Sequence, residues 1–252
     1  MFSPSVQDSI AVIIPARYAS SRLPGKPLLD LAGKPMIRHV YERASQAAVA
    51  AVWVATDDER IVAAVQAFGG QVLLTAADHP SGSDRVAEAA RSLSATIIVN
   101  VQGDEPLLDP QLINQVAAPL LQDPTLPMAT AAHPIDNPAE MQDANVVKVV
   151  CNRQGNALYF SRAPIPFDRD CPFNGPPLLR HLGLYAYRAS FLQTLATLPP
   201  TALEQRERLE QLRVLEYGYP IRVVITEQAA IGVDTPADAE RVRQLLGQGR
   251  HE

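Results

Sequence analysis

Short apolar runs alternate repeatedly along the first half of the chain with longer amphipathic patterns of helical period. Strand-like runs cover 9–14, 52–55, 71–74 and 97–101, and helix-like patterns cover 36–48, 59–68 and 83 to about 93. Strands this apolar are typical of parallel sheets that are covered by helices on both faces. We therefore predict an α/β fold with an open, mostly parallel sheet flanked by helices, in which ligands bind beyond the carboxyl ends of the strands. Asp57 and Ser83 are the predicted N-caps of the second and third helices.

The pattern changes between Pro134 and about Arg188. Strand-like runs at 146–150, 157–161 and 181–187 are separated by turns that carry Pro and Gly, with no long helix between them. This pattern predicts an antiparallel β flap, at about 134–190, inserted in a single domain that spans 1–252. Such a flap covers the active site, forms a subunit interface, or does both. A helix over 203–217, a strand over 221–226 and a closing helix over 236–246 are predicted to follow.

Composition excludes several classes of function. The net charge of −5 argues against a protein that binds nucleic acid by broad phosphate neutralisation. The apolar stretches fall short of the roughly 20 residues that a membrane span needs, and no charged-then-apolar leader precedes them. Cys151 and Cys171 are too few for a disulfide scaffold. We expect a cytoplasmic protein whose partners are small molecules, with neither nucleic acid nor membrane among them.

A cationic loop follows the first predicted strand. Arg17, Arg22 and Lys26 lie within 15–27, where guanidinium and ammonium groups suit the oxygens of a triphosphate and Gly25 permits close backbone approach. Pro27 follows Lys26 where a P-loop has Ser or Thr, and no dinucleotide-binding glycine fingerprint is present. A solvated basic loop is the alternative, which the position at a strand's carboxyl end disfavours.

Asp104 and Asp234 form the candidate acidic pair, each predicted at a strand end in a turn. Magnesium prefers few carboxylates together with phosphate oxygens and water, so two aspartates that meet at a nucleotide would satisfy it. Taken singly, the Asp104 segment reads equally as a simple turn and Asp234 as the cap of the last helix. No histidine spacing indicates zinc.

Several ordered motifs resemble one family of enzymes. Pro15-Ala16-Arg17, followed by 21–28, resembles the signature of sugar nucleotidyltransferases that activate acidic sugars. The further motifs lie at 78–85, 100–106, 159–162, 179–185, 209–213 and 232–236. Together they resemble the 3-deoxy-manno-octulosonate cytidylyltransferases over about 10–246. The sequence departs from that pattern at Ser83, where the family pattern has Thr, and at Phe167, where it has Trp.

The resemblance implies an enzyme that transfers CMP from CTP to the anomeric hydroxyl of 3-deoxy-D-manno-octulosonate (Kdo), giving CMP-Kdo and pyrophosphate for lipopolysaccharide biosynthesis. It also implies a Mg²⁺ cofactor and a homodimer. Two alternatives stay open: a cytidylyltransferase for another acidic sugar, such as 8-amino-Kdo or a sialic acid, and a catalytically inactive nucleotide-binding module.

The residue roles follow from the cations, the acidic pair and the resemblance. The candidate catalytic residues are Arg17, Lys26, Asp104 and Asp234, of which Asp104 and Asp234 are the metal ligands. The candidate nucleotide-binding residues are Arg17, Arg22, Lys26, Ser81, Gly82, Arg85 and Gln102, and the candidate sugar-binding residues are Arg162, His181, Tyr185, Glu210 and Gln211. A surface arginine at 85, a packed strand histidine at 181 and a solvated glutamate at 210 are the structural alternatives.

Overall fold

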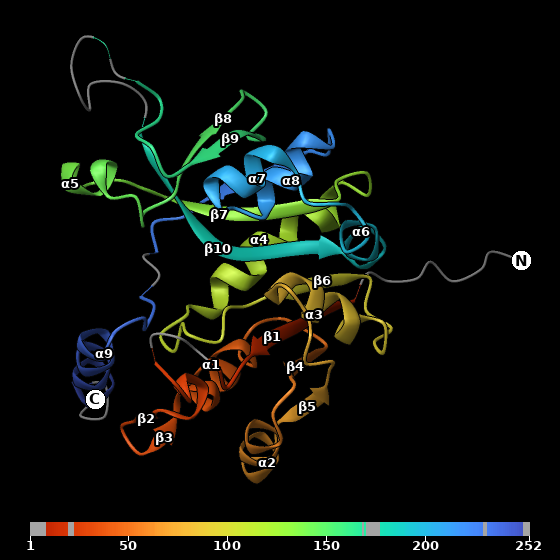
Figure 1. The fold of residues 1–252 in the computed structure, drawn as a ribbon, viewed down its shortest axis with the longest axis vertical. Helices are drawn as coiled ribbons and strands as arrows, with labels where there is room; N and C mark the ends of the chain where they lie inside the picture. The colour runs from red at the N-terminus through yellow and green to blue at the C-terminus, as the bar shows by residue number, and fades with distance from the viewer. Residues whose placement is uncertain (1–8, 20–22, 168, 170–176, 229–230, 249–252) are drawn as a thin grey trace, which may run out of the picture. The chain divides into compact units, whose positions relative to one another are not determined.

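The computed structural model describes residues 9–19, 23–167, 169, 177–228 and 231–248. The chain divides into two compact units, which we call the first and the second unit (Figure 1). The first unit contains 1–114 and 230–252, and the second contains 115–229, so that the division falls within helix α4 (Pro110–Gln122). Chain segments from both ends of the sequence therefore build the first unit.

A four-stranded parallel sheet forms the centre of the first unit. Its strands are β1 (Ile10–Ala16), β4 (Ala51–Thr56), β5 (Gln71–Leu74) and β6 (Ile97–Asn100), in the order β6-β1-β4-β5. The side chains of 12–14 and 97–99 are completely buried. Their burial confirms the prediction that these apolar runs form strands covered on both faces.

Helices α1 (Met36–Ala44), α2 (Glu59–Ala67) and α3 (Gly82–Ala90) follow three of these strands. Both predicted N-caps were wrong. The carboxylate of Asp58 accepts the N–H of Arg60 at 2.9 Å, and the hydroxyl of Ser81 accepts the N–H of Asp84 at 3.1 Å. Each cap residue has extended backbone dihedral angles, which the cap position requires, and Asp57 and Ser83 lie one residue before and two residues after the true positions.

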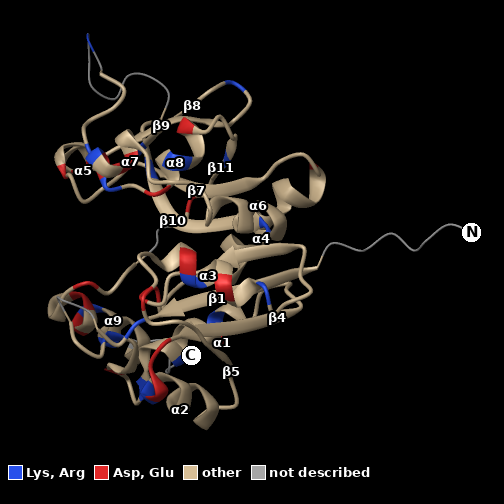
Figure 2. Ribbon diagram, turned by 45° about the vertical axis from the view of Figure 1, so that its right-hand side comes forward, with Lys and Arg blue, Asp and Glu red and all other residues tan. Residues whose placement is uncertain are grey.

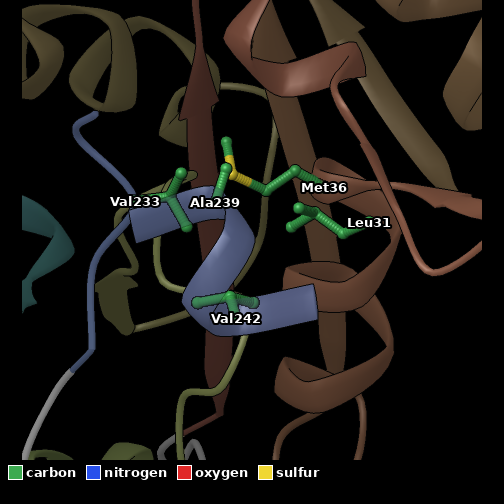
Figure 3. Close-up of a cluster of buried hydrophobic side chains, with 5 residues drawn as sticks. All are labelled: Leu31, Met36, Val233, Ala239 and Val242. Atoms are coloured by element: carbon green, nitrogen blue, oxygen red, sulfur yellow. The ribbon is translucent and has the colours of Figure 1, made fainter. Parts of the chain in front are cut away.

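The closing helix α9 (Pro236–Gln248) is anchored in the first unit by a buried apolar cluster (Figure 3). The cluster joins Val233, Ala239 and Val242 to Leu31 of the hairpin β2–β3 (Asp30–Leu31 and Lys34–Pro35) and to Met36 of α1. Each of these five side chains is at most 2% exposed. This packing fixes the segment that carries Asp234 beside residues from the start of the chain.

The second unit has a mixed sheet. Its strands are β7 (Met128–Pro134), β8 (Lys148–Cys151), β9 (Ala157–Ser161), β10 (Leu179–Arg188) and β11 (Ile221–Ile225). β11 pairs with β7 in parallel, and the pairs β7–β10, β10–β8 and β8–β9 are antiparallel. The register of β7 and β10 shifts between Leu182 and Tyr185, which marks a bulge.

Short helices accompany this sheet: α5 (Pro138–Gln142), α6 (Ala189–Leu195), α7 (Ala202–Glu207) and α8 (Gln211–Glu216). The predicted single helix over 203–217 was wrong, because Arg208 adopts a left-handed conformation with φ 56° and ends α7. The partly buried ion pair of Glu204 and Arg213, at 2.5 Å, then joins α7 to α8.

The predicted fold class, an α/β sheet with mostly parallel strands, flanking helices and additional antiparallel strands, is confirmed. The antiparallel strands β8, β9 and β10 fall within the segment predicted as a flap, whose boundaries stay a prediction. None of the helices in the described residues is long and apolar enough to cross a membrane.

Candidate active site

Three loops of the first unit leave the carboxyl ends of neighbouring parallel strands. β1 leads into Arg17, β6 leads toward Asp104, and β4 leads into Asp57. Because β6, β1 and β4 are adjacent and parallel, these loops emerge along one edge of the sheet. That edge is where open α/β sheets bind their ligands.

The ammonium group of Lys26 joins the two candidate aspartates. Its Nζ donates to Oδ2 of Asp104 at 2.7 Å and to Oδ1 of Asp234 at 3.1 Å. The Lys26 side chain is 12% exposed, whereas those of Asp104 and Asp234 are 36% and 53% exposed. The structure therefore brings together three residues predicted to carry the reaction, and the two carboxylates stay accessible to a ligand.

Two glycines allow Lys26 and Asp104 to lie close together at the end of β1. Gly25, directly before the short 3₁₀ helix η1 (Lys26–Leu28), has φ 70°, a left-handed conformation that favours glycine. At Gly103, a Cβ atom would lie 3.0 Å from the carbonyl oxygen of Pro15, which is closer than ordinary contact allows. Glycine at 103 therefore lets the turn that carries Asp104 lie against the end of β1 without this close contact.

Asp234 is placed differently from the prediction. It follows an irregular segment, so the predicted strand end was wrong, and it lies two residues before Pro236, the first residue of α9. The N–H of Val233 donates to the carbonyl of Asp104 at 2.9 Å, which connects the two acidic segments through the backbone. The carboxylate of Asp238 accepts the N–H groups of Asp234 and Thr235, so that Asp238 holds the start of α9.

The donor set at Asp104 and Asp234 fits a magnesium ion. Both carboxylates already converge on one cationic atom, the Nζ of Lys26. No group of three or more His, Cys, Asp or Glu ligands occurs among the described residues, so an all-protein metal cage is absent there. Two carboxylates without a cage are what Mg²⁺ uses when phosphate oxygens and water complete its coordination. Burial, together with the charge of Asp104, raises the pKa of the neighbouring Glu105 to about 7.

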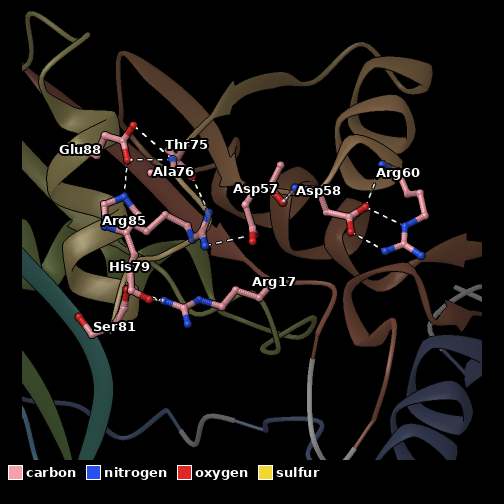
Figure 4. Close-up of polar contacts among 11 residues, drawn as sticks. Arg17, Asp57, Asp58, Arg60, Thr75, Ala76, His79, Ser81, Arg85 and Glu88 are labelled. Carbon is pink, nitrogen blue, oxygen red and sulfur yellow. Dashed lines mark hydrogen bonds and ion pairs between the residues drawn. The ribbon is translucent and has the colours of Figure 1, made fainter.

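Arg17 is held against the loop that precedes α3 (Figure 4). Its Nη2 donates to the carbonyl of His79 at 2.7 Å and to that of Ser81 at 2.8 Å. The ring of His79 contacts the carboxylate of Glu88, which also accepts the N–H of Ala76. The cationic loop and the turn that carries the nucleotide-binding candidates Ser81 and Gly82 are thus part of one hydrogen-bonded arrangement.

Arg85 is completely buried, so the alternative of a surface arginine was wrong. It donates to the hydroxyl of Thr75, and its Nη2 lies 3.1 Å from the carboxylate of Asp57. Burial lowers the pKa of Arg85, while the charge of Asp57 opposes that shift. Its Nε has no hydrogen-bond partner in the described part of the chain. Figure 2 shows both acidic and basic positions along α3, the helix that carries Arg85.

The other nucleotide candidates lie around the same edge. Ser81 and Gly82 begin α3, with Ser81 as its N-cap, and Gln102 lies in the turn after β6. Arg22 lies outside the described residues. The nucleotide roles of all these residues stay predictions.

The five sugar candidates all belong to the second unit. His181 and Tyr185 lie on β10, Arg162 directly follows β9, and Glu210 and Gln211 lie at the start of α8. The ring of His181 lies 5.3 Å from that of Tyr185, and the ring of Phe160 packs edge-on against the His181 ring at 4.9 Å. Burial raises the pKa of Tyr185 well above 10, with Tyr187 and Glu210 adding to the shift. The structure therefore places His181 and Tyr185 side by side.

Arg162 is held by backbone carbonyls. Its Nε donates to the carbonyl of Glu207 and its Nη1 to that of Ala144, both at 2.8 Å. The carboxylate of Glu207 accepts instead from the hydroxyl of Ser161 and from the N–H of Arg162. Lys148, completely buried, donates to the carbonyl of Arg162 at 2.7 Å. This leaves a guanidinium whose described hydrogen bonds all go to neutral oxygens.

Sequence reasoning missed the residues that support these candidates. Asp57, Glu207 and Thr130 each contact a predicted site residue. The sequence pattern predicts a helix cap at Asp57, and nothing in the residue types of Glu207 or Thr130 distinguishes them from surface residues. A partner that lies far along the chain becomes visible only in the folded structure.

A parallel α/β sheet with a cationic loop and two converging aspartates beyond its carboxyl edge has the architecture of a nucleotidyltransferase. The family model for cytidylyltransferases matches residues 11–225, and the chain belongs to this family.

Individual known proteins that are similar to the chain define a narrower class within this family. A 3-deoxy-manno-octulosonate cytidylyltransferase of Syntrophobacter fumaroxidans is 57% identical over 95% of this chain and 97% of its own. The enzyme of the same name from Syntrophotalea carbinolica is 54% identical over 94% of this chain and 98% of its own. The solved structure of a CMP:2-keto-3-deoxy-manno-octonic acid synthetase complexed with CTP matches with a TM-score of 0.92 and 50% identity, over 96% of this chain and all of that one.

Proposed function

We propose that this protein transfers CMP from CTP to the anomeric hydroxyl of Kdo, with release of pyrophosphate. The observation that carries the proposal is the convergence of Asp104, Asp234 and Lys26 at the carboxyl edge of the sheet. The similarity over nearly the whole chain to enzymes named for this reaction supports the choice of CTP and Kdo. In this reaction a sugar oxygen–phosphorus bond forms at the α-phosphate, and the bond to pyrophosphate breaks.

The cationic residues hold and stabilise the phosphates. Arg17 is oriented by its two carbonyl acceptors through Nη2, so that its remaining guanidinium donors serve the β- and γ-phosphate oxygens. Lys26 lies between the two carboxylates, where its charge would stabilise the negative charge that develops on departing pyrophosphate. Arg22, in the same loop of the sequence, is proposed to assist.

Asp104 and Asp234 are the proposed magnesium ligands. When bound there, Mg²⁺ supplies positive charge that polarises the α-phosphate and favours ionisation of the attacking hydroxyl. The chain's own contribution is to fix the two carboxylates, through Gly103 and the Val233–Asp104 backbone hydrogen bond. Catalysis then consists chiefly of positioning and electrostatic stabilisation.

The turn before α3 is the proposed reader of the pyrimidine. Ser81 and Gly82 offer backbone groups at the start of this helix, and Gln102 lies beyond the end of neighbouring β6. Arg85 is the proposed donor to the cytosine carbonyl. Its buried Nε has no hydrogen-bond partner among the described residues, which supports a role toward a ligand or a water molecule.

The sugar carries a carboxylate and several hydroxyls, so its pocket needs a cation and hydrogen-bonding side chains. Arg162 is the proposed cation, because its described hydrogen bonds go only to neutral carbonyl oxygens and leave its charge uncompensated by them. His181, Tyr185, Glu210 and Gln211 are the proposed partners of the sugar hydroxyls.

A cytoplasmic location, a homodimeric assembly and a place in lipopolysaccharide biosynthesis complete the proposal. They rest on the resemblance to the family and on the composition of the chain. Light scattering at several concentrations would test the homodimer, which predicts twice the 27.3 kDa mass of the chain.

The test of the function is pyrophosphate release from CTP and Mg²⁺ with and without Kdo, with N-acetylneuraminate and 8-amino-Kdo as competing substrates. Release that depends on Kdo and prefers it is the expected result. Preference for another sugar would support the proposed CMP transfer but refute Kdo as the substrate. Absence of release with every sugar would leave nucleotide binding without catalysis as the function.

A further inference from the structure

Thr130 is a completely buried threonine of β7 that makes three polar contacts in the second unit. Its Oγ1 lies 2.9 Å from Nε2 of His181, 2.8 Å from the carbonyl oxygen of Leu184 and 3.2 Å from that of Leu182. Both carbonyls belong to the bulge of β10, where the register with β7 shifts. The hydroxyl therefore lies between a strand irregularity and the imidazole of a sugar-binding candidate.

The hydroxyl of Thr130 has one proton to distribute among these contacts. A carbonyl oxygen can only accept, so the proton goes to Leu184, with Leu182 as the more distant acceptor. The contact with His181 is then satisfied only if Nε2 carries a proton and donates to Oγ1. If Oγ1 instead donated its proton to Nε2, the two carbonyl oxygens would face lone pairs of a buried oxygen, which costs free energy.

A neutral imidazole has a single N–H, and burial lowers the pKa of His181 to about 3, so the ring is neutral at physiological pH. With the proton on Nε2, the lone pair of Nδ1 is available as an acceptor. Among the described residues Nδ1 has no hydrogen-bond partner. The edge-on ring of Phe160 and the neighbouring ring of Tyr185 hold the imidazole in place.

We propose that Thr130 is a positioning residue that fixes His181 as the Nε2–H tautomer, so that Nδ1 accepts a hydrogen bond from a hydroxyl of the sugar. The inference rests on the proposed function for its ligand, a polyhydroxylated acidic sugar, and on the hydrogen-bond geometry of Thr130 for the tautomer. Thr130 itself touches no substrate in this account.

The first test uses ¹⁵N nuclear magnetic resonance of the histidine rings in the substrate-free protein, with His181→Asn to assign the signal. Nε2 should show the shift of a protonated nitrogen and Nδ1 that of an unprotonated one. Thr130→Val removes the acceptor of the Nε2 proton, so the Nδ1–H tautomer should become the major form, whereas Thr130→Ser should keep the wild-type signals. Protonation at Nδ1 in the wild-type protein would overturn the proposal, and this measurement does not depend on whether Thr130→Val folds.

The second test measures the KM values for Kdo and for CTP. Thr130→Val should raise the KM for Kdo at least about tenfold and leave the KM for CTP within about twofold, because one hydrogen bond to the sugar is lost. Thr130→Ser should restore the Kdo value. The matched control is Thr226→Val, which removes another buried threonine hydroxyl of the same unit, one that accepts the N–H of Gln228 at 3.2 Å.

The outcomes separate this inference from the proposed function. A wild-type protein that releases no pyrophosphate with Kdo would refute the function, while the resonance measurement would still decide the tautomer. A Kdo-dependent wild type whose KM for Kdo is unchanged in Thr130→Val would refute the positioning role. An equal loss in Thr130→Ser would show that the methyl group matters, and would also overturn the proposal.

Discussion

The N–H of Val233 donates to the carbonyl oxygen of Asp104 at 2.9 Å, so the backbone itself connects the two segments that carry the candidate metal ligands. Val233 is completely buried in the cluster that anchors α9, and Gly103 allows the Asp104 turn to lie against the end of β1. The spacing of the two carboxylates is therefore set by main-chain contacts, and a change to either carboxylate should alter chemistry more than folding.

Asp104→Asn is expected to reduce the rate of pyrophosphate release by about a hundredfold or more, because it removes a preorganised charge while keeping the size of the side chain. Asp136→Asn, at an exposed aspartate, is the matched control and should have no effect. Steady-state rates and circular dichroism spectra would check both variants. A loss of less than about threefold would remove Asp104 from the mechanism.

Gly103→Ala is expected to lower both stability and activity, because its Cβ would lie 3.0 Å from the Pro15 carbonyl oxygen and push the Asp104 turn away. We expect a loss of about 1–3 kcal/mol in the free energy of unfolding. Gly247→Ala provides the contrast: no atom lies within 4 Å of its added Cβ, and alanine is the better helix former. Urea denaturation should show opposite signs for the two variants; equal effects would contradict this account.

Asp57→Ala should destabilise the protein by about 3 kcal/mol, because it leaves the completely buried guanidinium of Arg85 without its carboxylate partner. Glu240→Ala breaks the more exposed contact of Glu240 with Arg243, at 3.3 Å, and should cost less than about 0.5 kcal/mol. Chemical denaturation of both variants measures the difference. Similar losses would mean that the buried pair is not a structural anchor.

His181 is expected to lower the free energy of unfolding as the pH falls. Its pKa is about 3 in the folded protein and near 6.5 when unfolded, so the unfolded state binds the extra proton between these values. Well above pH 6.5, His181 does not change the free energy of unfolding. Below pH 6.5 it lowers the free energy of unfolding by about 1.4 kcal/mol per pH unit, until about pH 3. Between pH 7 and 5 the wild type should lose about 2 kcal/mol more than His181→Asn. Parallel losses in the two proteins would place the pKa of His181 near its ordinary value.

The sequence predicted the elements whose local pattern is strong. The runs at Gln71–Leu74 and Ala157–Ser161 form strands with the predicted bounds, because each is a short, mostly apolar run that follows a turn with glycine. The strand Met128–Pro134 was missed, because three alanines weaken its pattern and its pairing with β10 is not local. The break at Arg208 was missed because a left-handed conformation at arginine has no sequence signal.

The residues of the candidate site also divide into those that the sequence identifies and those that only the folded structure reveals. Lys26, Asp104 and Asp234 could be found from their residue types and motifs, and the structure places them together. The burial of Arg85 could not be predicted, because its partners Asp57 and Thr75 come from other segments of the chain. For the same reason, the contact of Thr130 with His181 becomes visible only when β7 and β10 are paired.

One assay decides whether this protein activates Kdo: pyrophosphate release from CTP and Mg²⁺ by the purified protein, measured with and without Kdo and repeated with Asp104→Asn. The account predicts release that requires Kdo and nearly disappears in the variant. Release without sugar, or none with any acidic sugar, would contradict the proposal that this protein activates Kdo.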